Sequence, residues 1–228
     1  MGDGVIVRFR CSATALLMGL AVWSLSMSAL AHPHGWIDLS VRVITDEEGR
    51  ATGLHQTWRM DPFYSLVVFD ELRNVPGSSF EEGLDQLGGE IRNNLSTQHY
   101  LTEVTLDGAP LTFGDVTEYT AMEHNDRLTF MFILPFETPP PLEGKRLQYR
   151  VFDPTYYIEV VHEADHNVPR DDALVHHGEP SCELSIDLAN PDPELVLQAA
   201  LLDINDDGGT ELGQFFAETG NVDCRTGE

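Results

Sequence analysis

Two histidines, His32 and His34, flank Pro33 directly after a stretch with the features of an export signal. If the chain is cut after Ala31, the α-amine and the ring Nδ1 of His32 can chelate one metal ion, and His34 can supply a third nitrogen. Because Pro33 has no N–H, binding of Cu(II) or Ni(II) through deprotonated backbone amides is blocked. The pattern therefore favours an amine-plus-imidazole site for Zn, Ni, Co or Cu, with an unliganded chain end as the alternative.

Further side chains could complete this site or collect ions for it. Asp38 lies shortly after His34, and we place His55 on a second strand that returns toward the start of the first. A second group of histidines lies in or beside the polar segment 163–181: His162, His166, His176 and His177. The polar composition and Pro169 argue against a long helix there, so we predict a flexible loop. This loop either binds metal ions weakly or is only a solvated acidic surface.

The segment 203–208 resembles the first half of a calcium-binding EF-hand loop, with oxygen-bearing side chains at alternate positions and a glycine at the sixth. The candidate calcium ligands are Asp203, Asn205, Asp207 and Glu211. The twelfth position is Gln214, however, where such loops carry a bidentate acid. An acidic turn between two helices is therefore the favoured interpretation, and a calcium site is the alternative.

The first residues indicate export. Arg8 and Arg10 precede an uncharged apolar run over 13–30, and the run closes in the small-residue pattern Ala-Leu-Ala. This arrangement predicts a signal peptide, residues 1–31, that is removed after Ala31. An uncleaved anchor is disfavoured because the run is slightly short and contains serines. A lipoprotein is disfavoured because no cysteine stands at the end of the run.

The remaining residues, 32–228, are long enough for a single periplasmic domain. No second long apolar run follows the first, so we expect no stable membrane insertion after cleavage. The whole chain has a formal net charge of −25, and Lys145 is its only lysine. Such a surface excludes nucleic acid and anionic lipid as partners and is compatible with attracting cations. The diffuse spread of the acids favours a simpler role in keeping the protein soluble in a saline habitat.

Cys182 and Cys224 remain after loss of the signal, and an oxidising compartment favours a disulfide between them. This bond would close a loop of about 40 residues and contribute roughly 4 kcal/mol to stability on the chain-entropy model. A thiolate metal site is disfavoured by the export and by the wide spacing of the two residues.

Hydrophobic periodicity predicts more strands than helices. The predicted strands are 36–45, 51–60, 100–106, 110–113, 116–123, 128–136, 147–152, 156–162 and 183–188. The predicted helices are 63–72, 80–95, 193–202 and 211–218. Because the strands follow one another in antiparallel-style runs, we predict an α+β fold with an antiparallel, sandwich-like core. The fold would begin with an N-terminal β-hairpin and end with a C-terminal helix pair.

Several short motifs resemble a bacterial periplasmic family of unknown function. They are 32–38, 58–61 with Phe63, 100–102, 107–108, 153–157, 212–213, 216–217 and Cys224, and they span nearly all of 32–224. Members of that family are described as the periplasmic component of an uncharacterised ABC-type transport system and are often encoded beside nickel/cobalt-type permeases. The resemblance implies a periplasmic location and a link to metal transport more than a mechanism.

Together these patterns favour a non-enzymatic periplasmic protein that holds or delivers a transition-metal ion for a membrane metal transporter. His32 and His34 would be the primary ligands, and Asp38 or His55 would complete the shell. The sequence contains no Gly-rich phosphate loop, nucleophile elbow or paired-cysteine zinc motif. Two alternatives stay open: a copper oxidoreductase that uses the same N-terminal histidine brace, and a structural or interaction module whose histidines are incidental.

Overall fold

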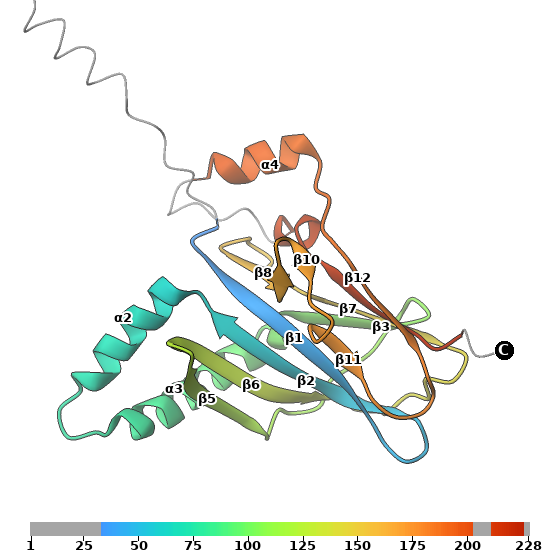
Figure 1. Ribbon diagram of the computed structural model, residues 1–228, viewed down its shortest axis with the longest axis horizontal. Helices are drawn as coiled ribbons and strands as arrows, with labels where there is room; N and C mark the ends of the chain where they lie inside the picture. The colour runs from blue at the N-terminus through green and yellow to red at the C-terminus, as the bar shows by residue number, and fades with distance from the viewer. Residues whose placement is uncertain (1–32, 203–210, 226–228) are drawn as a thin grey trace, which may run out of the picture. The chain divides into compact units, whose positions relative to one another are not determined.

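The computed structural model describes residues 33–202 and 211–225 of the chain (Figure 1). Within these ranges two β-sheets share one hydrophobic core, which confirms the α+β class. The first sheet contains β1 (Gly35–Thr45), β2 (Ala51–Met60), β5 (Tyr119–His124), β6 (Arg127–Pro135), β8 (Ile158–His162) and β11 (Leu174–His176). The second contains β3 (Thr102–Leu106), β4 (Ala109–Pro110), β7 (Arg146–Val151), β12 (Glu183–Asp187) and β13 (Thr219–Asp223).

The strand β1 organises the first sheet. It pairs antiparallel with β2, from Ile37 opposite Met60 to Thr45 opposite Ala51, which confirms the predicted N-terminal hairpin. On its other edge it pairs in parallel with β8 over its first half and with β11 over its second half. The core-facing residues of β1 are Ile37, Leu39, Val41 and Val43. Because side chains alternate along a strand, the intervening residues face away from the core.

Helices α2 (Pro62–Arg73) and α3 (Phe80–Ser96) pack against β6 and β5 of the first sheet. A further α-helix is α4 (Pro193–Ala200), and η1 (His99–Leu101) and η2 (Gly213–Phe215) are short 3₁₀ turns. α2 begins where the Asp61 carboxylate accepts a hydrogen bond from the Tyr64 N–H at 2.9 Å. α3 begins with a capping box between Ser79 and Glu82. No helix within 33–202 or 211–225 is long and apolar enough to cross a bilayer.

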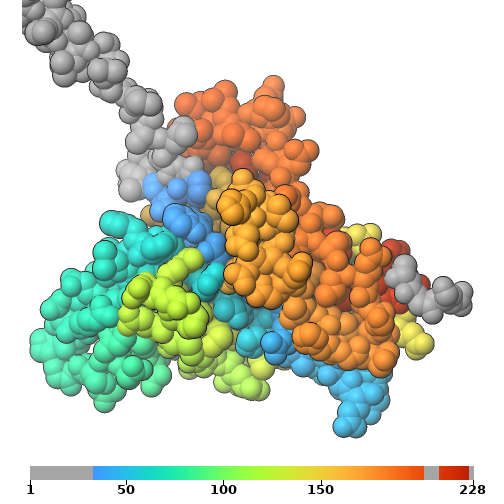
Figure 2. All heavy atoms as spheres, in the orientation of Figure 1, coloured from blue at the N-terminus to red at the C-terminus, as the bar shows by residue number. Residues whose placement is uncertain are grey.

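Helix α2 carries apolar side chains on its exposed side as well as on its buried side. Phe69 is 3% exposed and packs in the core, whereas Phe63 is 77% exposed and Leu66 is 62% exposed. Tyr64 and Val67 are exposed on the same helix, which lies at the surface (Figure 2, teal). An exposed apolar helix face of this kind is typical of a surface that another molecule covers.

The two phenylalanines of α2 offer a matched test of this packing. We expect Phe69→Ala to lower the free energy of unfolding by about 3–5 kcal/mol, because it leaves a cavity in the core. We expect Phe63→Ala to change it by about 0.5 kcal/mol or less, because its ring is in solvent. Urea unfolding followed by circular dichroism measures both, and equal losses would show that Phe63 is covered in the folded chain.

The predicted C-terminal helix pair is wrong. The first of its helices is present as α4, but the segment 211–218 contains only the three-residue turn η2. It leads into β13, which was not predicted and which pairs antiparallel with both β12 and β7. β13 begins only after the predicted helix, which is short and contains Gly213, and both properties disfavour a helix.

The segment 163–181 is not a plain loop. It contains β9 (Ala164–Asp165) and β10 (Val168–Pro169), which form a small hairpin, and it contains β11. Leu174 of β11 is buried and pairs with Val41 of β1. The segment is mostly polar, so its sequence did not indicate that Leu174 would join it to the first sheet.

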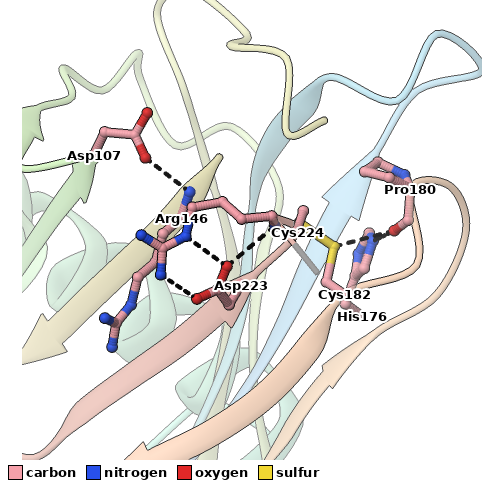
Figure 3. The surroundings of a disulfide bond; sticks show 8 residues. Asp107, Arg146, His176, Pro180, Cys182, Asp223 and Cys224 are labelled. Atoms are coloured by element: carbon pink, nitrogen blue, oxygen red, sulfur yellow. Dashed lines mark hydrogen bonds and ion pairs between the residues drawn. A yellow bond between two sulfur atoms is a disulfide. The ribbon is translucent and has the colours of Figure 1, made fainter. Parts of the chain in front are cut away.

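The predicted disulfide is present. Cys182 directly precedes β12 and Cys224 directly follows β13, two strands that pair antiparallel with Glu183 opposite Asp223 (Figure 3). The bond spans 42 residues of sequence. A cross-link over this distance stabilises the fold by roughly 4 kcal/mol, mainly by restricting the unfolded chain.

Candidate metal-binding site

The start of β1 presents a row of functional side chains on its outer face. Trp36 and Asp38 alternate with the buried residues of the strand and therefore point to the same side, and His34 directly precedes the strand. The His34 N–H donates a hydrogen bond to the Tyr157 carbonyl at 2.9 Å, and the two rings lie with centroids 4.5 Å apart. The backbone of His34 is thus attached to the first sheet.

Beside this row lies a pocket of about 580 Å³. Its ionisable lining residues are Asp38, Glu159, Glu218, His162 and His166, and Trp36 and Phe216 add aromatic walls. None of the lining side chains in the described part of the chain is Lys or Arg. Three carboxylates without a lining cation make the pocket attractive to positive ions.

His162 is held by hydrogen bonds at both ring nitrogens. Its Nδ1 lies 2.7 Å from the Glu218 Oε2, and its Nε2 lies 2.7 Å from the Tyr149 hydroxyl. Burial, together with the charge of Glu218, raises the pKa of the Tyr149 phenol well above its ordinary value. The phenol therefore stays protonated and donates to Nε2, while Nδ1–H donates to Glu218. Both nitrogens are occupied by hydrogen bonds, so His162 could bind a metal ion only if one of these bonds were broken.

The backbone near the pocket is arranged to make this contact possible. The ring of Tyr149 lies against Gly220, where a Cβ atom would be 2.2 Å from ring carbons. His162 ends β8 of the first sheet, Tyr149 lies on β7 of the second, and Glu218 directly precedes β13. The hydrogen-bonded chain from Tyr149 through His162 to Glu218 therefore connects the two sheets; we call it the inter-sheet network.

Glu159 and Asp38 have different charged neighbours. Burial raises the pKa of the Glu159 carboxyl, the nearby Glu218 charge raises it further, and a hydrogen bond from the Tyr156 hydroxyl at 3.2 Å opposes both. The charge of Asp38 is balanced by an ion pair with Arg127. Glu159 is therefore the lining carboxylate that gains most from a bound cation.

A second, smaller hydrophobic cluster reaches the pocket through Phe216. Tyr156 stacks on Phe216 with ring centroids 3.9 Å apart, and Leu212 and Ala199 of α4 are buried beside them. Gly213 donates its N–H to the Pro154 carbonyl at 2.9 Å. A Cβ at Gly213 would lie 1.8 Å from the Asp153 oxygen, so only glycine permits this approach. Segments 153–157 and 212–216 are thus joined at the pocket.

The other predicted ligands do not come together. His55 pairs with Arg42, roughly 26 Å along β1 from His34 at about 3.3 Å per residue, so it does not lie beside His34. Burial, and then the Arg42 charge, lowers the pKa of the His55 imidazole. His176 aligns with Val43 at the same distant end, and its Nε2 lies 3.1 Å from the Pro180 carbonyl near the disulfide (Figure 3).

The remaining predicted residues have separate outcomes. His166 is exposed at the β9–β10 turn and lines the pocket, and His177 is exposed after β11. His32 and the calcium candidates Asp203, Asn205 and Asp207 lie outside the described residues, while Glu211 is exposed. Within 33–202 and 211–225, no three His, Cys, Asp or Glu side chains are grouped so that they could hold one ion.

Glu159, Glu218 and Trp36 were missed in the sequence. Trp36 could have been found, because it shares one face of the predicted strand with Asp38. Glu218 could not, because its segment was assigned to a helix and its partner His162 is distant in sequence.

Comparison with known proteins places the chain in a family. Residues 17–224 match a family model described as "Protein of unknown function (DUF1007)". The chain belongs to this family. An uncharacterized protein of Haemophilus influenzae is 25% identical over 220 residues, which cover 92% of this DUF1007 chain and 98% of that relative.

The inter-sheet network can be tested by removing one hydroxyl. We expect Tyr149→Phe to lower the free energy of unfolding by about 1–3 kcal/mol, because the buried Nε2 of His162 loses its donor. The matched control is Tyr119→Phe, at a tyrosine that is 36% exposed, where we expect a change of about 0.5 kcal/mol or less. Equal effects in urea unfolding would mean that the hydrogen bond to His162 contributes nothing.

Proposed function

We propose that this DUF1007 protein is an exported, non-enzymatic accessory protein that holds or delivers a Zn, Ni, Co or Cu ion for a membrane transporter. One observation carries the proposal. His34 directly precedes β1, and Trp36 and Asp38 at the start of this strand line a pocket that contains three carboxylates. A metal ion held at the chain terminus would therefore lie beside a surface that favours cations.

The ligand set combines the chain end with the pocket. The α-amine and ring of His32 supply two nitrogens, and His34 supplies the third. Borderline nitrogen ligands of this kind suit late first-row divalent metals. Glu159 and His166 are the pocket residues that remain to assist, because His162 is occupied by the inter-sheet network and Asp38 is paired with Arg127.

The proposed transporter partner is supported by the position of α2. The N–H of Asp61, which precedes α2, donates to the Trp36 carbonyl at 3.0 Å. The exposed apolar face around Phe63 and Leu66 therefore begins next to the pocket end of β1. A partner that covers this face would approach the metal-binding terminus at the same time. The family resemblance to components encoded near nickel/cobalt-type permeases agrees with this arrangement.

Titration of the correctly processed protein tests the site. We expect Zn and Ni to bind with one ion per chain and to raise the melting temperature, because a ligand of the native state stabilises it. His34→Ala, or one extra glycine before His32, should weaken binding at least tenfold, which is about 1.4 kcal/mol. His124→Ala, at an exposed histidine outside the pocket, is the matched control. Unchanged affinity in the glycine-extended form would refute the terminal site.

The same titration has a defined pH dependence. Amine and imidazole ligands must lose their protons to bind a metal, so we expect the affinity to fall steadily as the pH is lowered from about 7.5 to 5.5. Calorimetry in buffers of different ionisation enthalpy would count the released protons. Proton release that is the same in wild type and in His34→Ala would argue against His34 as a ligand.

A further inference from the structure

A larger cleft, separate from the metal-binding pocket, lies beside β3 and β4. It has a volume of about 880 Å³ and shares no lining residue with the pocket described above. One wall is β3 with the turn η1, and the other is the segment 111–115, which crosses toward the first sheet. Phe113 forms an isolated bridge with Phe136, and the Gly114 N–H donates to the Pro135 carbonyl at 2.9 Å.

The turn η1 gives this cleft a fixed and strained wall. His99, Tyr100 and Leu101 have φ angles of 50°, 55° and 50°, a run of three left-handed residues with no glycine among them. Such conformations cost energy and persist only where the surrounding structure enforces them. Strained segments of this kind cluster at ligand-binding sites, so the strain is a reason to ask what the cleft holds.

A buried chain of hydrogen bonds enforces the strain. The Thr102 hydroxyl donates to the Tyr100 carbonyl at 2.7 Å and accepts from the Gln56 Nε2 at 3.1 Å. The Gln56 Oε1 in turn accepts from the Trp58 Nε1 at 2.9 Å. Gln56 is fully buried, and Trp58 and Thr102 are nearly so. The wall of the cleft is therefore preformed and not free to collapse.

The chemistry of the lining limits the ligand. Its apolar residues include Leu101, Val104, Leu111, Phe113 and Phe152. Its charged residues are Glu103, Asp115 and Glu137, and within the described ranges no Lys or Arg lines the cleft. The charge of Glu103 is balanced by Arg150 at 2.6 Å, which leaves Asp115 and Glu137. These two lie on neighbouring segments, because the Glu137 N–H donates to the Thr112 carbonyl at 3.0 Å.

An extended peptide fits this cleft poorly. Strand addition would need the free edge of β3, but β4 pairs there with Thr105 and Leu106, and the Leu111 N–H donates to the Val104 carbonyl. Pro110 on β4 removes a further donor, as is common on protected edges. The volume is in the usual range for small-molecule sites, about 300–1,000 Å³.

We infer that this cleft binds a small organic cation with an apolar body. The apolar group lies against Leu111 and Phe113, and the positive charge lies near Asp115 and Glu137. The overall charge of −25 favours a cation over an anion at the same surface. The site is independent of the proposed metal function, because none of its residues belongs to the metal-binding pocket.

Calorimetry with three ligands of equal chain length tests the inference. We expect octyltrimethylammonium to bind at one saturable site, octanol at least tenfold more weakly, and octyl sulfate not at all. The double variant Asp115→Asn with Glu137→Gln replaces two exposed acids and should weaken the cation at least tenfold. Thr105→Arg places a positive charge in the lining and should abolish binding.

The control separates this site from general attraction to an acidic chain. Asp85→Asn with Glu90→Gln removes the same charge from two exposed positions of α3 and should change the affinity less than twofold. Thermal melting checks that each variant is folded. Equal losses in the two double variants, equal binding of octanol or octyl sulfate, or the absence of saturable binding would each overturn the inference.

Discussion

The structure around the pocket depends on one buried imidazole that is hydrogen-bonded at both nitrogens. His162 receives a hydrogen bond from Tyr149 and donates one to Glu218, and it thereby joins β8 of the first sheet to β7 and β13 of the second. The backbone N–H of His162 donates to the same Glu218 oxygen at 2.7 Å, which fixes that carboxylate further. A buried polar chain that is satisfied in this way specifies one packing of the two sheets. It also makes His162 a structural residue, although the sequence suggested a ligand.

The carboxylates of Glu159 and Glu218 make the pocket negatively charged. Glu218 is held in place by its hydrogen bonds from His162. Burial raises the pKa of Glu159, and the charge of Glu218 raises it further. Two close carboxylates in a partly buried space repel each other, and a cation between them relieves that repulsion. In the proposed function, the N-terminal histidines add nitrogen donors to the His166 imidazole, which lines the pocket. Specificity for a transition metal would come from those nitrogens, and the local concentration of cations from the carboxylates.

Local patterns were enough to predict much of the fold. The hairpin of β1 and β2, the helix over 63–72 and the disulfide all follow from hydrophobic periodicity and cysteine count. These features are determined by residues close in sequence or by a pair without alternatives. The strand β13 was missed because its stability comes from β12 and β7, which contribute hydrogen bonds from distant segments.

The site could be predicted only in part for the same reason. The face shared by Trp36 and Asp38 follows from strand periodicity, but the position of His55 depends on the register of the hairpin. The role of His162 depends on Tyr149 and Glu218, which come from the second sheet. The Tyr149 ring reaches His162 only because Gly220 has no side chain to block it. No spacing of residues along the chain indicates such a contact.

We predict that His34 binds metal and that His162 does not. Nuclear magnetic resonance of histidine-labelled, correctly processed protein distinguishes the two imidazoles by their ring nitrogens during a zinc titration. We predict that the His162 ring nitrogens are unchanged by zinc, while the His34 nitrogens shift with the first equivalent. A shift of the His162 nitrogens with the first equivalent, with His34 unaffected, would contradict this prediction.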